Sequence, residues 1–212
     1  METINFVVSG LGGQGILFMT KVLAQAALKK GCRVMGAETH GMAQRGGSVV
    51  SHLRLGDSKG SLVRTGTAHF LLSLDESEAY RNLPFLAPGG ALYANAGPRS
   101  FPRGEVRAYL EKKGIRWRAM EATRAAVDLG APLSSNLALL GFFAGSGEGP
   151  MGPRDLEETI EMISPERFRN QNLRVFRAGL ESAGGVREPG AMATVGRRAS
   201  SWPRAPLPAW DA

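Results

Sequence analysis

The chain has 212 residues, a net charge of +7 and 43% hydrophobic residues. This length suits one α/β domain, alone or with a tail, and the apolar content is sufficient for a packed core. No apolar run approaches the ~18 residues of a membrane span, and the N-terminus lacks the basic leader of a signal peptide. The arginines are scattered and are not gathered with aromatic residues. We therefore expect neither a membrane nor a nucleic acid as a partner.

Cys32 is the only cysteine of the sequence. One thiol cannot form an intrachain disulfide, and it cannot hold an iron–sulfur cluster, which usually takes about four cysteine ligands. Any iron–sulfur chemistry would therefore belong to another chain. A single thiol also fits a reducing cytoplasm, which is the localisation that we expect.

Strands and helices alternate along the first half of the chain. The β-branched and aromatic run at 4–8 predicts a buried strand, and an apolar-periodic helix is predicted over 13–30, with Gly31 as its stop. The remaining elements of this half are strands predicted over 33–37, 48–55, 68–74 and 91–95, and a short helix over 76–83. The polar segment 38–47 is expected to be a loop.

The second half is more helical. Helices are predicted over 103–113, 122–129, 136–143, 153–162 and 165–180, with one further strand over 115–119. Together, these elements predict an α/β fold, Rossmann-like, with a mostly parallel sheet, flanking helices and a helical C-terminal part. We expect one domain over 1–183. The segment 184–212 is rich in proline, glycine and arginine without periodicity, which predicts a disordered tail.

A glycine-rich turn follows the first predicted strand. Gly10, Gly12 and Gly15 match the G-x-G-x-x-G pattern, in which glycines permit a tight turn and the helix N-terminus offers N–H groups to an anion. Glu38, near the end of the second predicted strand, is suitably spaced to bind the ribose of a dinucleotide. A stand-alone NAD- or FAD-binding oxidoreductase is therefore one interpretation, and a turn without a ligand is another.

A second glycine-rich segment spans 38–48 and combines three glycines with polar side chains. This composition favours a loop shaped to meet a ligand or a partner, although a solvated loop has the same composition. His40 is the best candidate for a polar contact, with a loop-bracing role as the alternative. Arg45 suits phosphate or carboxylate recognition through its forked donors, and an interface ion pair is its alternative.

Together, the two segments resemble one family. Gly-Leu-Gly-Gly-Gln-Gly-Ile at 10–16 and His-Gly-Met-Ala-Gln-Arg-Gly-Gly-Ser at 40–48, followed by Ser-His-Leu-Arg at 51–54, are similar to the γ-type domain of 2-oxoacid:ferredoxin oxidoreductases. The form of the second segment is most similar to the indolepyruvate (arylpyruvate) branch. The resemblance covers about residues 1–180. The sequence offers no catalytic arrangement of side chains, and its three histidines have no spacing that suggests a metal site. The candidate cofactor-binding residues are Gly10, Gly12, Gly13, Gln14, Gly15, His40, Gln44, Arg45, Gly46 and Gly47.

The resemblance also implies an activity for the assembled enzyme. That enzyme would decarboxylate an aryl 2-oxoacid oxidatively with thiamine diphosphate, pass electrons through iron–sulfur clusters to ferredoxin, and form an acyl-CoA. A large partner subunit would carry the thiamine and iron–sulfur sites. This chain would bind no cofactor alone, would pack against that subunit and would serve the coenzyme A step. A non-catalytic scaffold is a third interpretation.

The remaining polar residues have structural interpretations. His52 and His69 lie on predicted strands, and Cys32 is expected to be a small buried residue. The run Ser134 to Asn136 opens a leucine-rich helix and favours an N-cap, with a ligand contact as the alternative.

Overall fold

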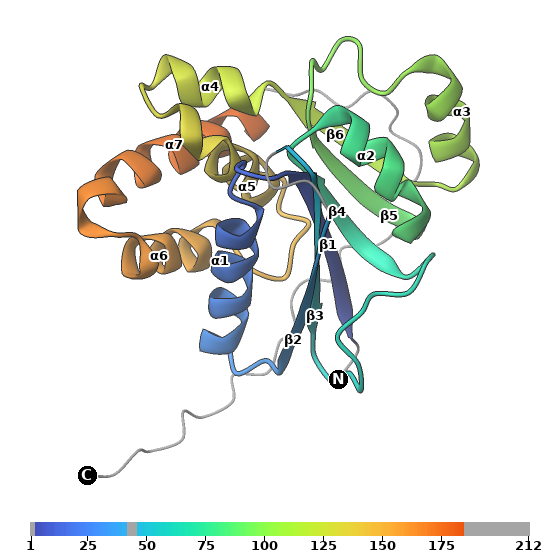
Figure 1. Ribbon diagram of the computed structural model, residues 1–212, viewed down its shortest axis with the longest axis horizontal. Helices are drawn as coiled ribbons and strands as arrows, with labels where there is room; N and C mark the ends of the chain where they lie inside the picture. Colours follow the sequence, from blue (N-terminus) through green and yellow to red (C-terminus); the bar gives the residue numbers. More distant parts are fainter. Residues whose placement is uncertain (1–2, 42–45, 185–212) are drawn as a thin grey trace.

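The structure, a computed structural model, describes residues 3–41 and 46–184 (Figure 1). A six-stranded sheet in the order β2-β3-β1-β4-β5-β6 separates two layers of helices. The strands are β1 (Ile4–Leu11), β2 (Val34–His40), β3 (Ser48–Leu55), β4 (Ala68–Ser73), β5 (Leu86–Asn95) and β6 (Arg116–Met120). Neighbours from β1 through β4 and β5 to β6 are parallel, whereas β3 is antiparallel to both β1 and β2. The expected Rossmann-like α/β fold is confirmed, with β3 as the exception to a parallel sheet.

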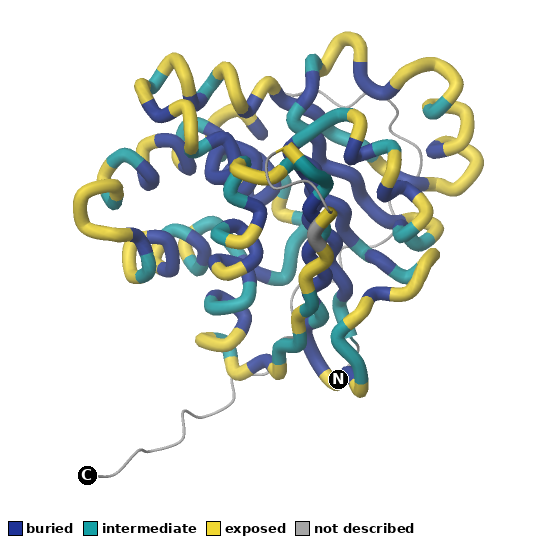
Figure 2. Tube along the Cα trace, in the orientation of Figure 1, coloured by how far each residue is buried: buried dark blue, intermediate teal, exposed yellow. Residues whose placement is uncertain are grey.

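Helices cover both faces of the sheet. The larger core lies on one face and includes residues from α1 (Ile16–Lys29), α4 (Ala122–Asp128), α5 (Ser135–Gly145), α6 (Pro153–Ile163) and α7 (Glu166–Gly184). On the opposite face, α2 (Glu76–Asn82) and α3 (Gly104–Lys112) cover a smaller core. Figure 2 shows the buried trace running along the central strands and α5, with exposed residues on the outer helices. Within the described ranges, no helix is long and apolar enough to cross a membrane. The segment 185–212, most of the predicted disordered tail, lies outside the described residues.

Glycines set the spacing between α5 and α7. Helix α5 is buried along nearly its whole length, and α7 packs on it with Val175 and Phe176 buried. A Cβ atom at Gly141 would overlap the carbonyl of Phe176, and one at Gly179 would overlap the carbonyl of Ala138. The two helices are therefore closer than any larger residue at these positions would allow.

We predict that Gly179→Ala destabilises the fold by about 1–3 kcal/mol or more, because backbone atoms of α5 must move to admit the methyl group. Urea unfolding of the full chain measures this change. The matched control is Gly104→Ala on α3, where nothing lies within 4 Å of the added Cβ. Equal stability of the two variants would contradict the close approach of α5 and α7.

An ion pair fastens α6 to the end of α1. Lys30 Nζ lies 2.7 Å from Asp155 Oδ2, which also accepts the backbone N–H of Gly152 at 2.8 Å. Partial burial acts to raise the pKa of Asp155. The hydrogen bonds from Lys30 and Gly152, together with the charges of Lys30 and Arg154, outweigh burial and hold that pKa below its ordinary value.

The sign of the pH effect follows from this lowered pKa. The ionised carboxylate stabilises the fold above the pKa of an unfolded aspartate, about 3.9, and this stabilisation is lost as the pH falls through the lower folded-state value. We predict that Asp155→Asn reduces the free energy of unfolding by no more than about 1 kcal/mol at pH 7, because the pair is partly exposed. The difference from the parent protein should shrink between pH 5 and pH 2, as followed by urea unfolding at each pH. A difference that grows on acidification would refute this assignment.

Candidate functional site

The register of β1 and β3 brings the two glycine-rich segments together. Leu11 is paired with Ser48, and the N–H of Gly12 donates to the carbonyl of Gly47 at 2.9 Å. The base of the second segment is closed by the N–H of Gly41, which donates to the carbonyl of Ser48 at 2.8 Å. We call residues 10–15, 41 and 46–48 the turn–loop unit. Segments about thirty positions apart in the sequence thus form one continuous surface element.

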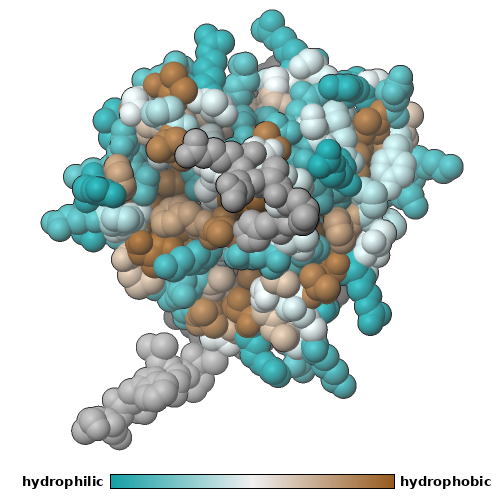
Figure 3. Space-filling view, viewed as in Figure 1, coloured by the Kyte–Doolittle hydropathy of each residue, from teal (hydrophilic) through white to brown (hydrophobic). Residues whose placement is uncertain are grey.

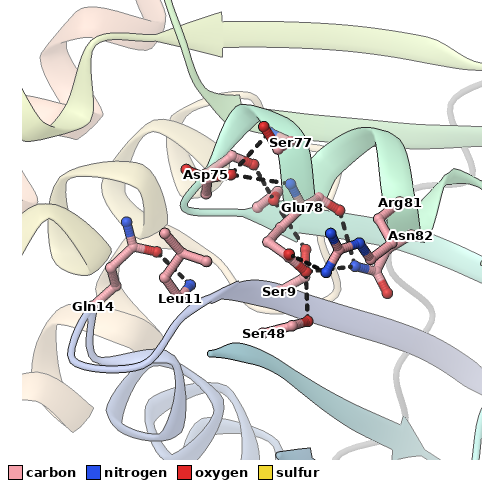
Figure 4. Close-up of polar contacts among 10 residues, drawn as sticks. Ser9, Leu11, Gln14, Ser48, Asp75, Ser77, Glu78, Arg81 and Asn82 are labelled. Atoms are coloured by element: carbon pink, nitrogen blue, oxygen red, sulfur yellow. Dashed lines mark hydrogen bonds and ion pairs between the residues drawn. The ribbon is translucent and has the colours of Figure 1, made fainter. Parts of the chain in front are cut away.

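The glutamine of the turn is a brace. Strand β1 extends through Leu11 and α1 begins only at Ile16, so the turn starts later and the helix is shorter than predicted. Gln14 Oε1 accepts the N–H of Leu11 at 2.7 Å (Figure 4). Gln14 Nε2 donates to the carbonyl of Leu74 at 3.3 Å. Both ends of the amide are therefore used to hold the turn against β1 and the end of β4.

The positions of the turn are occupied by glycine for different structural reasons. A Cβ at Gly10 would lie 2.6 Å from Gln14 Oε1, so close packing requires a glycine there. Gly13 has φ +97°, a conformation that side chains rarely adopt, but nothing lies within 4 Å of the added Cβ. Gly12 is exposed, and a Cβ there would make only ordinary contacts with the loop. The part of the turn that faces solvent is thus Gly12 and Gly13.

Asn136 secures the other end of the turn. Gly15 has φ +79°, and its added Cβ would lie 2.6 Å from Asn136 Nδ2. That amide donates to the carbonyl of Gly15 at 3.0 Å. Ser134 occupies the predicted N-cap position of α5, but it makes no side-chain cap bond and its hydroxyl is directed to Asn172. Asn136 instead links the turn to the buried helix α5.

Several N–H groups of the turn are consumed internally. Those of Leu11, Gly12 and Gln14 donate to Gln14 Oε1, the Gly47 carbonyl and the Leu11 carbonyl. An anion cradle in a glycine-rich turn depends on N–H groups that are directed outward to the ligand. The internal bonds therefore favour a turn that packs against another surface over one that surrounds a phosphate.

The second segment is only partly described. His40 is the last residue of β2, not a loop residue, and is paired through Val49 of β3 with Gly10. Gln44 and Arg45 lie outside the described residues. Gly46 has φ +69° and, with Gly47, approaches Gly12. Of the predicted candidates, the structure brings Gly46 and Gly47 to the glycine turn and places the backbone of His40 one strand further out.

Strand β3 also separates Glu38 from the turn. Glu38 is paired with Ser51, which is paired with Val8, so an antiparallel strand lies between β2 and β1. In dinucleotide-binding domains the second strand lies directly beside the first and places its acidic residue near the glycine turn. Two strand spacings here amount to roughly 10 Å. Glu38 is therefore displaced from the position that ribose binding would require.

A polar network continues from β1 to α2 (Figure 4). Ser9 Oγ donates to Ser73 Oγ at 2.9 Å, and Ser73 Oγ donates to the carbonyl of Asp75 at 2.8 Å. One turn into α2, Glu78 Oε2 accepts the hydroxyl of Ser48 at 2.6 Å. Nothing in the sequence marks Glu78 as a site residue, because an acidic residue on a short helix is ordinarily a solvated one.

Two open grooves lie elsewhere, at the carboxyl ends of β5 and β6. Their volumes are about 310 and 420 Å³, and both are lined by Glu121 and Arg124. Asn95, in the wall of the larger groove, is bonded to the carbonyl of Leu74 and to Thr123. The amide of Asn95 is thus already engaged in bonds within the protein.

The other predicted structural residues are placed as expected. Cys32 is buried, and His69 Nδ1 accepts the N–H of Asn5 at 3.0 Å. His52 is 4% exposed and packs edge-on against Phe85, and burial lowers its pKa and so favours the neutral ring. Among the residues that the structure describes, no group of three His, Cys, Asp or Glu side chains could hold a metal ion.

The fold and the turn–loop unit define the class of protein as a Rossmann-like α/β domain with an antiparallel strand inserted beside β1 and a braced glycine turn. A family model described as pyruvate ferredoxin/flavodoxin oxidoreductase matches residues 5–182. The chain therefore belongs to this family.

Individual relatives agree with this assignment. The chain is 32% identical over 196 residues to the indolepyruvate oxidoreductase subunit IorB of Thermococcus kodakarensis, covering 86% of this chain and 97% of that subunit. It shares its fold with the γ subunit of a keto/oxoacid ferredoxin oxidoreductase from Geobacter sulfurreducens, at a TM-score of 0.67 and 23% identity over 86% and 99% of the two chains. A 2-oxoglutarate:ferredoxin oxidoreductase from Magnetococcus marinus, solved with coenzyme A bound, has a TM-score of 0.71 and 19% identity. That match covers 89% of this chain and 32% of the other.

The contact between Gly15 and Asn136 gives a prediction about stability. Gly13→Ala should cost about 1–2 kcal/mol from its left-handed backbone alone. Gly15→Ala should cost more, because the added Cβ also displaces the Asn136 amide. In a double-mutant cycle, Asn136→Ala should therefore cost less in the Gly15→Ala background than in the parent protein. Additive free energies from urea unfolding would show that Asn136 does not secure the turn.

Proposed function

We propose that this chain is the small subunit of an indolepyruvate-type 2-oxoacid:ferredoxin oxidoreductase and is inactive by itself. The assembled enzyme converts an aryl 2-oxoacid oxidatively to an acyl-CoA and passes the electrons to ferredoxin. The observation that carries this proposal is the match to an archaeal indolepyruvate oxidoreductase subunit along nearly its whole length. The displacement of Glu38 by β3 argues against the alternative, a stand-alone NAD- or FAD-binding enzyme.

The cofactor chemistry is assigned to a larger partner subunit. Thiamine diphosphate supports decarboxylation, and iron–sulfur clusters carry the electrons. The sequence offers one cysteine, and Cys32 is buried, so it does not provide the thiolate set that a cluster takes. We infer that the partner holds both groups and contacts ferredoxin, and that the assembly works in the cytoplasm.

The turn–loop unit is the surface that we assign to this assembly. Its N–H groups at Leu11, Gly12 and Gln14 are satisfied internally, which suits packing against protein better than enclosing a phosphate. Gly12 and Gly13 are exposed without side chains, so another surface can approach the backbone closely. A contact with coenzyme A is the second role. The Magnetococcus marinus enzyme of similar fold binds that cofactor, which supports testing it directly.

The surface outside the turn is consistent with a subunit. Figure 3 shows separate hydrophobic areas among the hydrophilic side chains on the face that carries α1. Exposed apolar residues of α1 and α6 include Leu17, Leu28 and Met162, which are between 43% and 52% exposed. Exposed apolar side chains of this kind are common where one chain packs on another.

Co-production with a thiamine- and cluster-containing large subunit tests the proposed activity. We predict coenzyme A-dependent oxidation of indolepyruvate coupled to ferredoxin reduction by the complex. Neither chain alone should support this reaction. Reduction of NAD or FAD by the isolated small chain would overturn the assignment.

Gly13→Val tests the turn. A Cβ added at Gly13 meets nothing within 4 Å in the isolated chain, so apart from the strain of its left-handed backbone the new side chain should obstruct only what approaches from outside. We predict a loss of at least about tenfold in kcat/KM of the assembled enzyme, roughly 1.4 kcal/mol. The matched control is Gly66→Val, which has a similar φ of +74° and equally open surroundings but lies before β4, away from the turn.

The two roles of the turn are separated by the kind of loss. Weaker association with the large subunit supports a packing contact, whereas intact association with a raised KM for coenzyme A supports a ligand contact. Equal activities of the Gly13→Val and Gly66→Val enzymes would show that the turn is only a connector.

A further inference from the structure

The carboxylate of Glu78 is buried and has a partner at each oxygen. Its side chain is 3% exposed. Oε2 accepts the hydroxyl of Ser48 at 2.6 Å, and Oε1 lies 2.9 Å from Arg81 Nη1 (Figure 4). Asn82 Nδ2 lies 3.5 Å from Oε2 and donates to the Glu78 carbonyl at 2.9 Å. An ionised carboxylate is costly to bury unless it is paired and hydrogen-bonded, and here it is both.

Helix α2, which carries Glu78, is itself fixed to the sheet. Asp75 caps the helix by accepting the N–H groups of Ser77 and Glu78. The Ser9–Ser73 hydroxyl pair and the N–H of Leu74, which donates to the Ser9 carbonyl, hold the segment before the helix against β1. Glu78 therefore extends from a support that does not depend on the second glycine-rich segment.

Ser48 is the point at which that segment joins the sheet. It follows Gly46 and Gly47 in the chain, and its carbonyl accepts the N–H of Gly41. Ser48 therefore joins the two ends of the second glycine-rich segment. Glycines have more conformational freedom to lose than other residues, so Gly46 and Gly47 before Ser48 need outside contacts to hold one conformation. A hydrogen bond to a carboxylate is stronger than one between neutral groups and suits this task.

We propose that Glu78 is a positioning residue, which binds the Ser48 hydroxyl and thereby fixes the backbone of Gly41, Gly47 and Ser48 in the conformation that the assembled enzyme uses. The proposal rests on the function proposed above for the turn–loop unit. Glu78 acts through Ser48 and contacts no substrate. The same contact also helps to fix Gly12 of the turn, because the N–H of Gly12 donates to the carbonyl of Gly47, the residue before Ser48.

Two amides report on this positioning. The N–H groups of Gly41 and Gly12 donate to the carbonyls of Ser48 and Gly47, so their hydrogen exchange in the full chain measures how often the base of the loop opens. We predict that Ser48→Ala speeds exchange at both amides at least about tenfold, with the melting temperature lowered by no more than about 4 °C. Ser48→Thr retains the hydroxyl and should restore slow exchange. Glu76→Gln is the control on the same helix, because Glu76 contacts Tyr80 and Arg103 and not the loop.

The complex with the large subunit separates this proposal from the proposed function. We expect Ser48→Ala to weaken association, or to raise the KM for coenzyme A, at least about tenfold with kcat within twofold, and Ser48→Thr to restore both. Unchanged exchange at Gly41 and Gly12 in Ser48→Ala would overturn the positioning role of Glu78. Faster exchange without any change in association or coenzyme A kinetics would support positioning and would instead show that the turn–loop unit is not the functional surface.

Discussion

The antiparallel insertion of β3 between β1 and β2 is the constraint on which the rest of the site depends. Because Leu11 is paired with Ser48, the last residue of β1 and the first residue of β3 lie side by side at the same end of the sheet. The same insertion moves Glu38 away from the glycine turn. With this strand order, the G-x-G-x-x-G turn lies beside the second glycine-rich segment and not beside the acidic residue that would bind a ribose.

The turn–loop unit is held by contacts with the interior of the domain and is exposed on its outer side. Gln14 braces the turn on β1 and β4, Asn136 secures it to α5, and Glu78 holds the base of the second segment. The interior contacts use side-chain amides and a carboxylate, whereas Gly12 and Gly13 face solvent without side chains. Such a surface is preorganised, so little conformational entropy remains to be lost when a second surface or a ligand approaches.

Local patterns in the sequence were sufficient to predict most elements. The β-branched and aromatic run at 4–8 and the apolar period of α1 predicted a strand and a helix that the structure contains, with the G-x-G-x-x-G turn between them, although β1 extends through Leu11. Strand order could not be predicted in the same way, because the direction of β3 is set by pairing between distant segments. Asn136 and Glu78 were missed as site residues for a related reason. Their contacts join α5 and α2 to segments far away in the sequence, and nothing in their local sequence indicates a distant partner.

The labelling of a cysteine in the turn tests the central claim most directly. The native Cys32 is buried, so Gly12→Cys introduces an exposed thiol over a low background. We predict that a maleimide modifies this thiol readily in the isolated chain and at least about tenfold more slowly after assembly with the large subunit or on addition of coenzyme A to the complex. An unchanged labelling rate under both conditions would contradict the assignment of the turn–loop unit as the functional surface.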